Sequence, residues 1–220
     1  MAPFLVSADA GSVQVHEGDL PEGLEFGDSV AIDTETMGLR PERDRLCVVQ
    51  LSDGVSGCHL VHFPPSMRRE PGPVYPAPRL RALLADESVT KLFHYARFDV
   101  AMLHRWLGVT CRPIYCTKIA SRLVRTYTDR HGLKELCREL LNVELSKEQQ
   151  SSDWGAAALS PEQVKYAASD VLWLHRLRDR LDAMLLREGR AELAQKCFEF
   201  VEHRARLDLE GWPEEDIFAH

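Results

Sequence analysis

Three short patterns in this sequence place carboxylates where they can hold a metal ion. The first is Asp33-Thr34-Glu35, which comes at the end of a predicted strand. Side chains alternate across a strand, so residues two apart point to the same side, roughly 7 Å from each other. Two carboxylates that leave a strand end together can share a divalent cation. The same pattern also arises by chance in a chain with 34 acidic residues.

The other two patterns lie farther along the chain. Residues 94–99 (HYARFD) follow a second predicted strand, and Asp99 stands where the chain enters a helix. Asp99 can reach the sheet edge that carries Asp33, or it can simply stabilise the positive end of its own helix. Residues 166–170 (YAASD) put a hydroxyl and a carboxylate four residues apart, on one face of a predicted helix. Alone, this pattern also fits an ordinary amphipathic helix.

The elements that must position these patterns are strands in the first half of the chain. Four short runs of apolar or β-branched residues predict strands at 30–32, 46–51, 57–61 and 90–93. The Ser-Asp-Gly turn at 52–54 predicts that the second and third strands form a hairpin. The proline-rich stretch 64–78 is typical of a surface loop.

Helices dominate the second half. Apolar spacing predicts helices at 79–84, 98–107, 119–124 and 133–141. Ser160, Pro161 and Glu162 form a helix start, from which one long helix is predicted to run toward Leu186. A final helix follows Gly189. We therefore expect an α/β fold with a mixed sheet, helices on both faces and a helical C-terminal half.

Composition narrows the class of protein. The net charge of −7 argues mildly against a nucleic-acid partner, although clustered metal-binding carboxylates would themselves add negative charge. No apolar run is long enough to cross a membrane, and the start lacks a secretory pattern, so a cytoplasmic location is expected. The six cysteines form no C-x-x-C pair and are expected to be reduced.

Six basic residues fall within one short stretch of the chain. They form either a phosphate-facing surface or, on balance, the solvated faces of two helices: Lys118, Arg122, Arg125, Arg130, Lys134 and Arg138.

The order of the three patterns resembles the DEDD superfamily of 3′-5′ exonucleases. The resemblance is to the subgroup with tyrosine in its last motif, because Lys165 stands where the other subgroup would carry histidine. It implies an RNase H-like fold and two divalent metal ions, Mg²⁺ or Mn²⁺. The implied metal ligands, all of them carboxylates as such hard ions prefer, are Asp33, Glu35, Asp99 and Asp170.

Residues 132–136, 145–154 and 159–167, together with His94 five positions before Asp99, narrow the resemblance to ribonuclease D. The resemblance spans about residues 30–177. It implies hydrolysis of single-stranded RNA from the 3′ end to nucleoside 5′-monophosphates, in transfer RNA processing or RNA decay. We expect one exonuclease domain over 1–220, with a core at about 30–187, a C-terminal helix at about 190–208 and no additional nucleic-acid-binding domain.

Catalytic and substrate-binding roles also follow from the resemblance. The pKa of a phenol, about 10, is too high for an efficient general base at neutral pH, so Tyr166 is expected to orient the attacking water, with Glu35 as second partner. Trp154 can stack on a base or pack in the core, and His94 favours a structural role bonded to backbone. The candidate substrate-binding residues are Thr34, Thr36, Gly38, Leu39, His94, Phe98, Lys147, Gln150, Ser152 and Trp154.

Several alternatives stay open. Long ribonuclease D proteins continue into helical nucleic-acid-binding domains, whereas this chain stops at His220, so substrate grip is expected to be weaker or supplied otherwise. Cys116-Thr117 replaces an aspartate-threonine pair, which puts a supporting contact in doubt. The enzyme could act mainly on DNA, or the fold could be a silent nucleic-acid-binding domain. It could be a monomer or a homodimer, with Phe198, Val201 and Leu207 of the last helix packing internally or against another copy.

Overall fold

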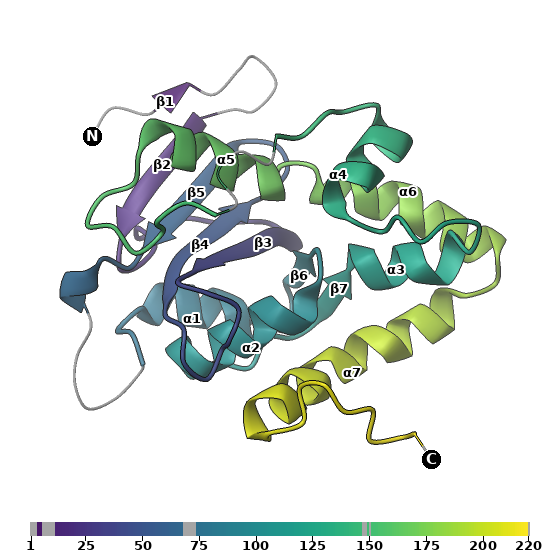
Figure 1. The fold of residues 1–220 in the computed structure, drawn as a ribbon. Coiled ribbons are helices and arrows are strands. Elements are labelled where there is room, and N and C mark those ends of the chain that lie inside the picture. The colour runs from purple at the N-terminus through teal and green to yellow at the C-terminus, as the bar shows by residue number, and fades with distance from the viewer. Residues whose placement is uncertain (1–3, 6–11, 68–73, 147–148, 150, 220) are drawn as a thin grey trace.

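A mixed seven-stranded sheet forms the centre of the protein in the computed structural model, which describes residues 4–5, 12–67, 74–146, 149 and 151–219 (Figure 1). Its strand order is β1-β2-β5-β4-β3-β6-β7. The strands are β1 (Phe4–Leu5), β2 (Ser12–Glu17), β3 (Ser29–Thr36), β4 (Leu46–Ser52), β5 (Gly57–His62), β6 (Thr90–Phe93) and β7 (Ile114–Cys116).

Strand β3 lies between an antiparallel partner, β4, and a parallel one, β6. The predicted hairpin of β4 and β5 is confirmed, and Asp53 caps its turn by accepting hydrogen bonds from the backbone N–H groups of Val55 and Ser56. Sequence patterns missed β2, which pairs parallel with β5, and the three-residue β7. Both are strands whose partners lie far away in the sequence, and a short run carries little periodicity.

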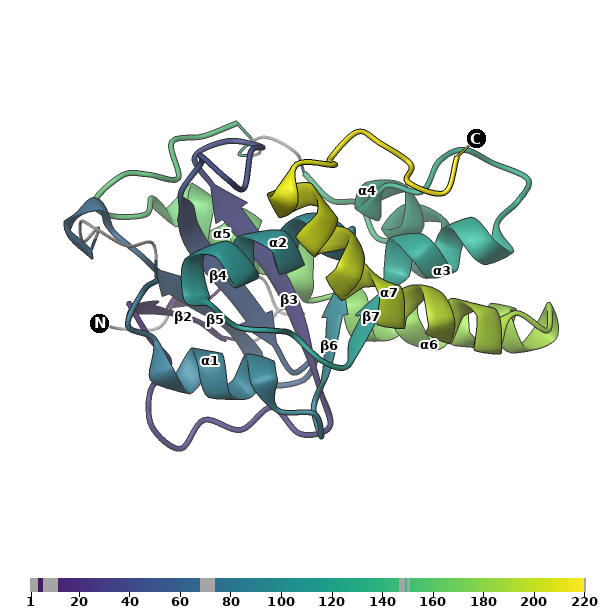
Figure 2. The same ribbon diagram turned by 90° about the horizontal axis from the view of Figure 1, so that it is seen from below.

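Helices cover both faces of the sheet, as expected. Helix α5 lies on one face, whereas α1 and α2 lie on the other (Figures 1 and 2). The remaining helices gather beyond β7, where α7 packs on α2 and β7 and α6 packs on α3. The helices are α1 (Pro78–Ala85), α2 (Ala96–Leu107), α3 (Thr117–Val124), α4 (Leu133–Leu136) with a π-helical turn (Cys137–Leu141), α5 (Pro161–Val171), α6 (Leu174–Arg187) and α7 (Ala191–Glu210).

The prediction of one long helix from Ser160 to Leu186 is wrong. The chain turns at Leu172 and Trp173, so that α5 ends at Val171 and α6 begins at Leu174. No proline or glycine marks this turn, which is why the sequence pattern runs through it. The two helices bury different surfaces, because α5 packs on the sheet and α6 packs on α3. Tertiary packing therefore sets the break.

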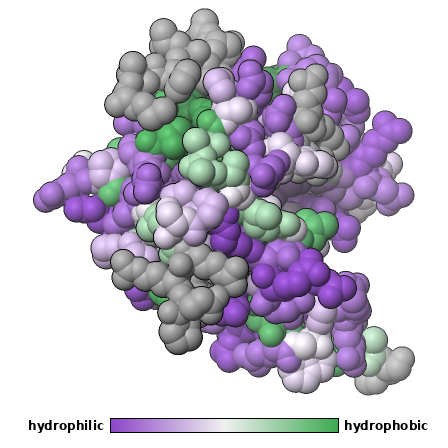
Figure 3. Space-filling model, turned by 60° about the vertical axis from the view of Figure 1, so that its left-hand side comes forward, coloured by the Kyte–Doolittle hydropathy of each residue, from purple (hydrophilic) through white to green (hydrophobic). Residues whose placement is uncertain are grey.

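The C-terminal helix α7 belongs to the packed body of the protein. Phe198 and Val201 are 4% and 3% exposed, and the Phe198 ring lies 4.6 Å from that of Tyr115. Of the two arrangements considered for these side chains, internal packing is the one observed. The face seen in Figure 3 is mostly hydrophilic, with hydrophobic side chains in small patches. Within the described part of the chain, no helix is long and apolar enough to cross a membrane.

Candidate active site

Three of the four predicted carboxylates converge above strand β3. Asp33 and Glu35 project from the strand toward α5, and Asp170 projects from α5 toward them. One oxygen from each of the three carboxylates lies within 4.8 Å of the others. The side chains of Asp33 and Glu35 lie on one face of β3, as the alternation along a strand predicted, and helix α5 supplies the third carboxylate from a position 135 residues farther along the chain than Glu35.

Asp99 approaches the same site from the other side of the sheet. It is 3% exposed, sits in the first turn of α2 and accepts a 2.6 Å hydrogen bond from the Thr34 hydroxyl. Thr34 lies between the two acidic residues of β3, so its side chain points to the opposite face. Asp99 is near enough to Asp33 for the charge of one to raise the pKa of the other. It therefore adjoins the group of three without joining it.

Burial and mutual repulsion make the metal-free carboxyls weak acids. Burial, followed by the charges of Asp33, Asp170 and Asp99, raises the pKa of Glu35 to about 10. Burial raises the pKa of Asp33 to about 7, and burial and the Asp33 charge raise those of Asp99 and Asp170 well above the usual range. Like charges this close need a cation between them, and an all-oxygen donor set fits a hard divalent ion.

Tyr166 shares the site with Asp170, one helical turn away on α5. Its hydroxyl donates a hydrogen bond to Asp170, and burial and the neighbouring carboxylates raise its pKa above that of a free phenol. The Trp154 ring lies 6.1 Å from the Tyr166 ring and is 2% exposed. Trp154 is thus packed in the core, and it would have to move before a base could stack on it.

The start of α5 is fixed by a capping box. The Ser160 hydroxyl accepts a hydrogen bond from the Gln163 backbone N–H, while the Gln163 side chain accepts one from the Ser160 N–H. The Gln163 amide also donates to the Ser152 hydroxyl and to the Asp153 carbonyl, each at 3.0 Å. Ser152, a predicted substrate contact, is therefore bonded to this helix. Lys147 and Gln150 lie outside the described residues.

Leu39 lies in the loop after β3, and its side chain extends into solvent. Leu39 is 84% exposed, and the Thr36 hydroxyl donates a 2.6 Å hydrogen bond to the Gly38 carbonyl. A Cβ atom on Gly38 would come within 2.3 Å of the Asp44 carboxylate, so only glycine fits this close approach. Asp44 in turn accepts a hydrogen bond from the Arg40 backbone N–H.

Leu39, Tyr95 and Phe98 are among the residues that line a groove of 430 Å³. Tyr95 has a left-handed backbone (φ 70°), and the Lys118 ammonium lies 4.1 Å from the centre of its ring. His94 hydrogen-bonds the Thr117 hydroxyl at 2.9 Å rather than backbone, and burial lowers its pKa to about 3. Thr117 thus provides a supporting contact although Cys116 replaces the aspartate before it.

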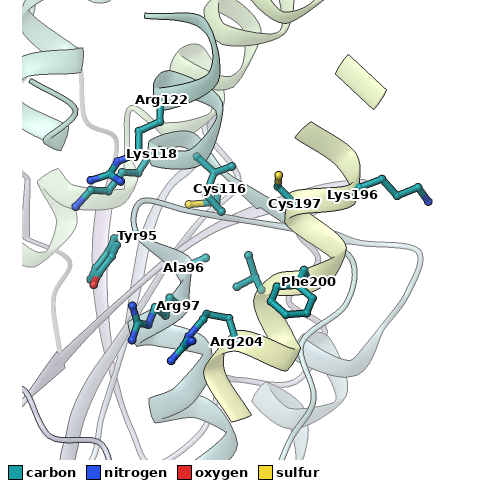
Figure 4. A pocket seen from close by; sticks show the side chains of 12 residues that line it. Tyr95, Ala96, Arg97, Cys116, Lys118, Arg122, Lys196, Cys197, Phe200 and Arg204 are labelled. Atoms are coloured by element: carbon teal, nitrogen blue, oxygen red, sulfur yellow. The ribbon is translucent and has the colours of Figure 1, made fainter. Parts of the chain in front are cut away.

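A cavity of 710 Å³ continues from Tyr95 between α2, α3 and α7 (Figure 4). Arg97 and Arg204 on its wall share an ion pair with Asp208. Lys118 and Arg122 also line it, and neither forms an ion pair with any described residue. Arg125 of the same basic stretch is fully buried in an ion pair with Glu139, so it is neither a phosphate contact nor a solvated residue.

Two polar side chains near the site were missed by the sequence patterns. Gln50 and His62 are buried on β4 and β5, and each has at least one side-chain polar atom without a hydrogen-bond partner among the described residues. For Gln50 a signal exists: it is a single amide within the apolar run 46–51 (LCVVQL). Nothing in the pattern says what that amide does.

Comparison with known proteins identifies relatives of this arrangement. A family model described as 3′-5′ exonuclease matches residues 17–186. Ribonuclease D from Acidiphilium cryptum is 34% identical over 163 residues, which cover 74% of this chain and 39% of that protein. The chain thus spans about two fifths of the length of this curated relative. Ribonuclease D from Escherichia coli has a TM-score of 0.69 at 25% identity and covers 81% of this chain with 45% of its own. The expected RNase H-like fold is confirmed.

A second set of solved structures matches at nearly full length. Brucella melitensis NrnC is 53% identical, with a TM-score of 0.88, and the match covers 94% of this chain and 98% of NrnC. The same protein has been solved with bound Mg²⁺ (51% identity, TM-score 0.87, 94% and 98% coverage) and bound to pGG (51%, 0.88, 96% and 100%).

Proposed function

Because the chain belongs to the 3′-5′ exonuclease family that includes ribonuclease D, we propose that it removes nucleotides from the 3′ end of single-stranded RNA and releases nucleoside 5′-monophosphates. The observation that carries the proposal is the convergence of Asp33, Glu35 and Asp170 within 4.8 Å, with Asp99 beside them. Tyr166 on the same helix face as Asp170 completes the set of residues. A silent binding domain would have no need of such a costly cluster of charge.

The four carboxylates would hold two divalent ions, Mg²⁺ or Mn²⁺, whose chemistry when bound would be to acidify a water molecule and neutralise charge on the scissile phosphate. The raised pKa values support this assignment, since the cluster binds protons in place of cations. Solved NrnC with Mg²⁺ supports it independently, through a relative that matches along nearly the whole chain.

Tyr166 and Glu35 would align the attacking water. With its pKa raised above that of a free phenol, Tyr166 stays neutral at physiological pH and cannot act as a base. The Tyr166 hydroxyl donates its hydrogen bond to Asp170, which leaves the lone pairs of the phenol oxygen to accept a hydrogen bond from the water. Glu35, on the strand opposite, would accept the second hydrogen bond of that water.

Short oligonucleotides fit the surface around the site. The groove between Leu39 and Phe98 can receive an unstacked base, and an 84% exposed leucine is free to contact it. Lys118 and Arg122 can meet phosphates upstream of the scissile bond, because described acidic residues do not neutralise them. The complex of NrnC with pGG supports a substrate as short as a dinucleotide.

Digestion of matched RNA and DNA oligonucleotides tests the proposal. Two lengths, pGG and a 5′-labelled 20-mer, would be incubated with Mn²⁺, with Mg²⁺ or with EDTA, and products resolved by chromatography. We expect nucleoside 5′-monophosphates from RNA with either metal and none with EDTA. Faster digestion of the DNA strands would contradict the assignment of RNA as the substrate. If no strand is digested, the proposal that the protein is an exonuclease is wrong.

A further inference from the structure

Gln50 occupies a position in which a glutamine needs an explanation. It is 0% exposed in the middle of β4, between Val49 and Leu51, which are also fully buried. Neither its amide nitrogen nor its amide oxygen has a hydrogen-bond partner among the described residues. Burying an unsatisfied amide destabilises a fold, and an apolar side chain of similar shape would be more stable at this position. Local packing therefore does not account for the residue.

The strand register places Gln50 beside the acidic cluster. Gln50 is paired directly with Asp33 across the antiparallel β3-β4 ladder. Directly opposite residues share one face of the sheet, with Cβ atoms about 5 Å apart. The face in question is the one that α5 covers and from which Asp33 and Glu35 meet Asp170. The Gln50 amide lies at the end of a flexible side chain and is not bonded to Asp33 in the structure, and a change of rotamer can bring it to the Asp33 carboxyl group.

An amide is the chemical group best suited to hold a carboxylate that must also bind a cation. A lysine or arginine at this position would neutralise Asp33 and compete with the metal ion, whereas an amide N–H supplies a hydrogen bond and no net charge. Hydrogen bonds from a second layer of residues orient carboxylate ligands in metal sites and tune metal affinity.

We propose that Gln50 is a positioning residue for Asp33: its amide nitrogen donates a hydrogen bond, directly or through one water, that orients the Asp33 carboxylate when the site binds its divalent ions. The proposal rests on the metal-dependent function proposed above. It assigns Gln50 no contact with the nucleic acid and no part in proton transfer.

Replacement of the amide by an apolar group separates this role from packing. Gln50→Met and Gln50→Leu keep most of the volume and remove the hydrogen bond. The matched control is Leu60→Met, because Leu60 is fully buried, pairs with Gln50 on its far side from Asp33 and shares the same face. Each variant would be checked by circular dichroism, and Mn²⁺ affinity would be measured by calorimetry on protein stripped with EDTA.

The Gln50 substitutions should weaken Mn²⁺ binding without destabilising the metal-free protein. Thermal stability of the metal-free Gln50 variants should equal or exceed that of the wild type, because an unsatisfied amide has gone. Their Mn²⁺ dissociation constants should rise about 10- to 100-fold, while that of Leu60→Met stays at the wild-type value. Folded Gln50 variants that bind Mn²⁺ as tightly as the wild type would overturn the proposal. A wild type that binds no Mn²⁺ would instead refute the proposed metal site, so the two failures are distinguishable.

Discussion

The Thr34 hydroxyl donates a 2.6 Å hydrogen bond to Asp99, 65 residues farther along the chain. Thr34 stands between two acidic residues that point to the other face of β3, so one tripeptide organises carboxylates on both sides of the sheet. This hydrogen bond joins strand β3 to helix α2, the two elements that carry Asp33 and Asp99. Without it, the buried Asp99 carboxyl group would keep only its hydrogen bonds to the backbone N–H groups of Asp99 and Thr34.

Removing this hydroxyl should weaken metal binding. Thr34→Val keeps the shape of the side chain and deletes the hydroxyl donor, so Asp99 loses one of the hydrogen bonds that orient it and keeps those from backbone N–H groups. We expect Mn²⁺ affinity to fall about tenfold, as for other residues that support metal ligands. The control is Thr90→Val, at a half-buried threonine at the start of strand β6. Equal affinity of the two variants in calorimetry would contradict a positioning role for Thr34.

Neutralising Glu35 should stabilise the protein and abolish its activity. Glu35→Gln removes a carboxyl group that must take up a proton on folding at neutral pH, so the melting temperature in EDTA should rise. Exonuclease activity should drop by roughly 10³-fold or more, equivalent to about 4 kcal/mol of activation free energy. Glu22→Gln, at an exposed residue of the loop before β3, should change neither quantity. A lower melting temperature for Glu35→Gln would contradict the destabilisation that burial and neighbouring charges are expected to cause at Glu35.

Metal binding should release protons and strengthen as the pH rises. In the metal-free fold the pKa of Asp33 is raised from 3.8 to about 7 and that of Glu35 from 4.5 to about 10. The folded protein thus keeps protons that the unfolded chain has lost, and its stability in EDTA should fall from pH 4 upward. At pH 6 we expect Mn²⁺ to displace at least one proton, measurable by calorimetry in two buffers of different ionisation enthalpy. Binding without proton release would contradict the raised pKa values.

Tyr166→Phe should separate water orientation from metal binding. The phenylalanine ring can still pack against Trp154, while the hydroxyl is lost. We expect kcat to fall about 100-fold with little change in Mn²⁺ affinity. Because the raised pKa keeps Tyr166 neutral, the pH profile of kcat should keep its shape. Loss of an ionisation from that profile in the variant would show that Tyr166 acts as a base.

Leu39→Ala should affect substrate binding alone. Leu39 is 84% exposed, so its removal costs little stability, but it deletes an apolar contact in the groove shared with Phe98. We expect KM for short RNA to rise several-fold, about 1 kcal/mol, with an unchanged melting temperature. Leu186→Ala is matched in chemistry and exposure, at 72%, and lies on α6. If both variants raise KM equally, the effect is not specific to the groove.

Sequence patterns predicted most of the site because its parts obey local periodicities. Asp33 and Glu35 follow from the two-residue repeat of a strand, and Tyr166 and Asp170 from the four-residue spacing of a helix. The same logic failed where distant packing decides. It could not show that Asp99 approaches from the opposite face, that Arg125 is buried against Glu139, or that the chain turns at Leu172.

The role of Gln50 could not be predicted from sequence patterns. Its strand was predicted correctly, yet its meaning depends on the register that pairs it with Asp33. Register joins residues from two strands, and it is fixed by the hairpin turn and by burial of one face of the sheet. A single strand read in isolation shows an unexpected amide and nothing about its neighbour.

The capping box at Ser160 limits which mutations this protein can accept during evolution. Each residue of an α-helix turns the next by about 100° around its axis. Because the start of α5 is fastened by Ser160 and Gln163, the angular setting of Tyr166 and Asp170 is decided ten residues before the last ligand. Inserting or deleting one residue between the cap and Tyr166 would swing both side chains away from β3. That segment can therefore accept substitutions far more readily than changes in length.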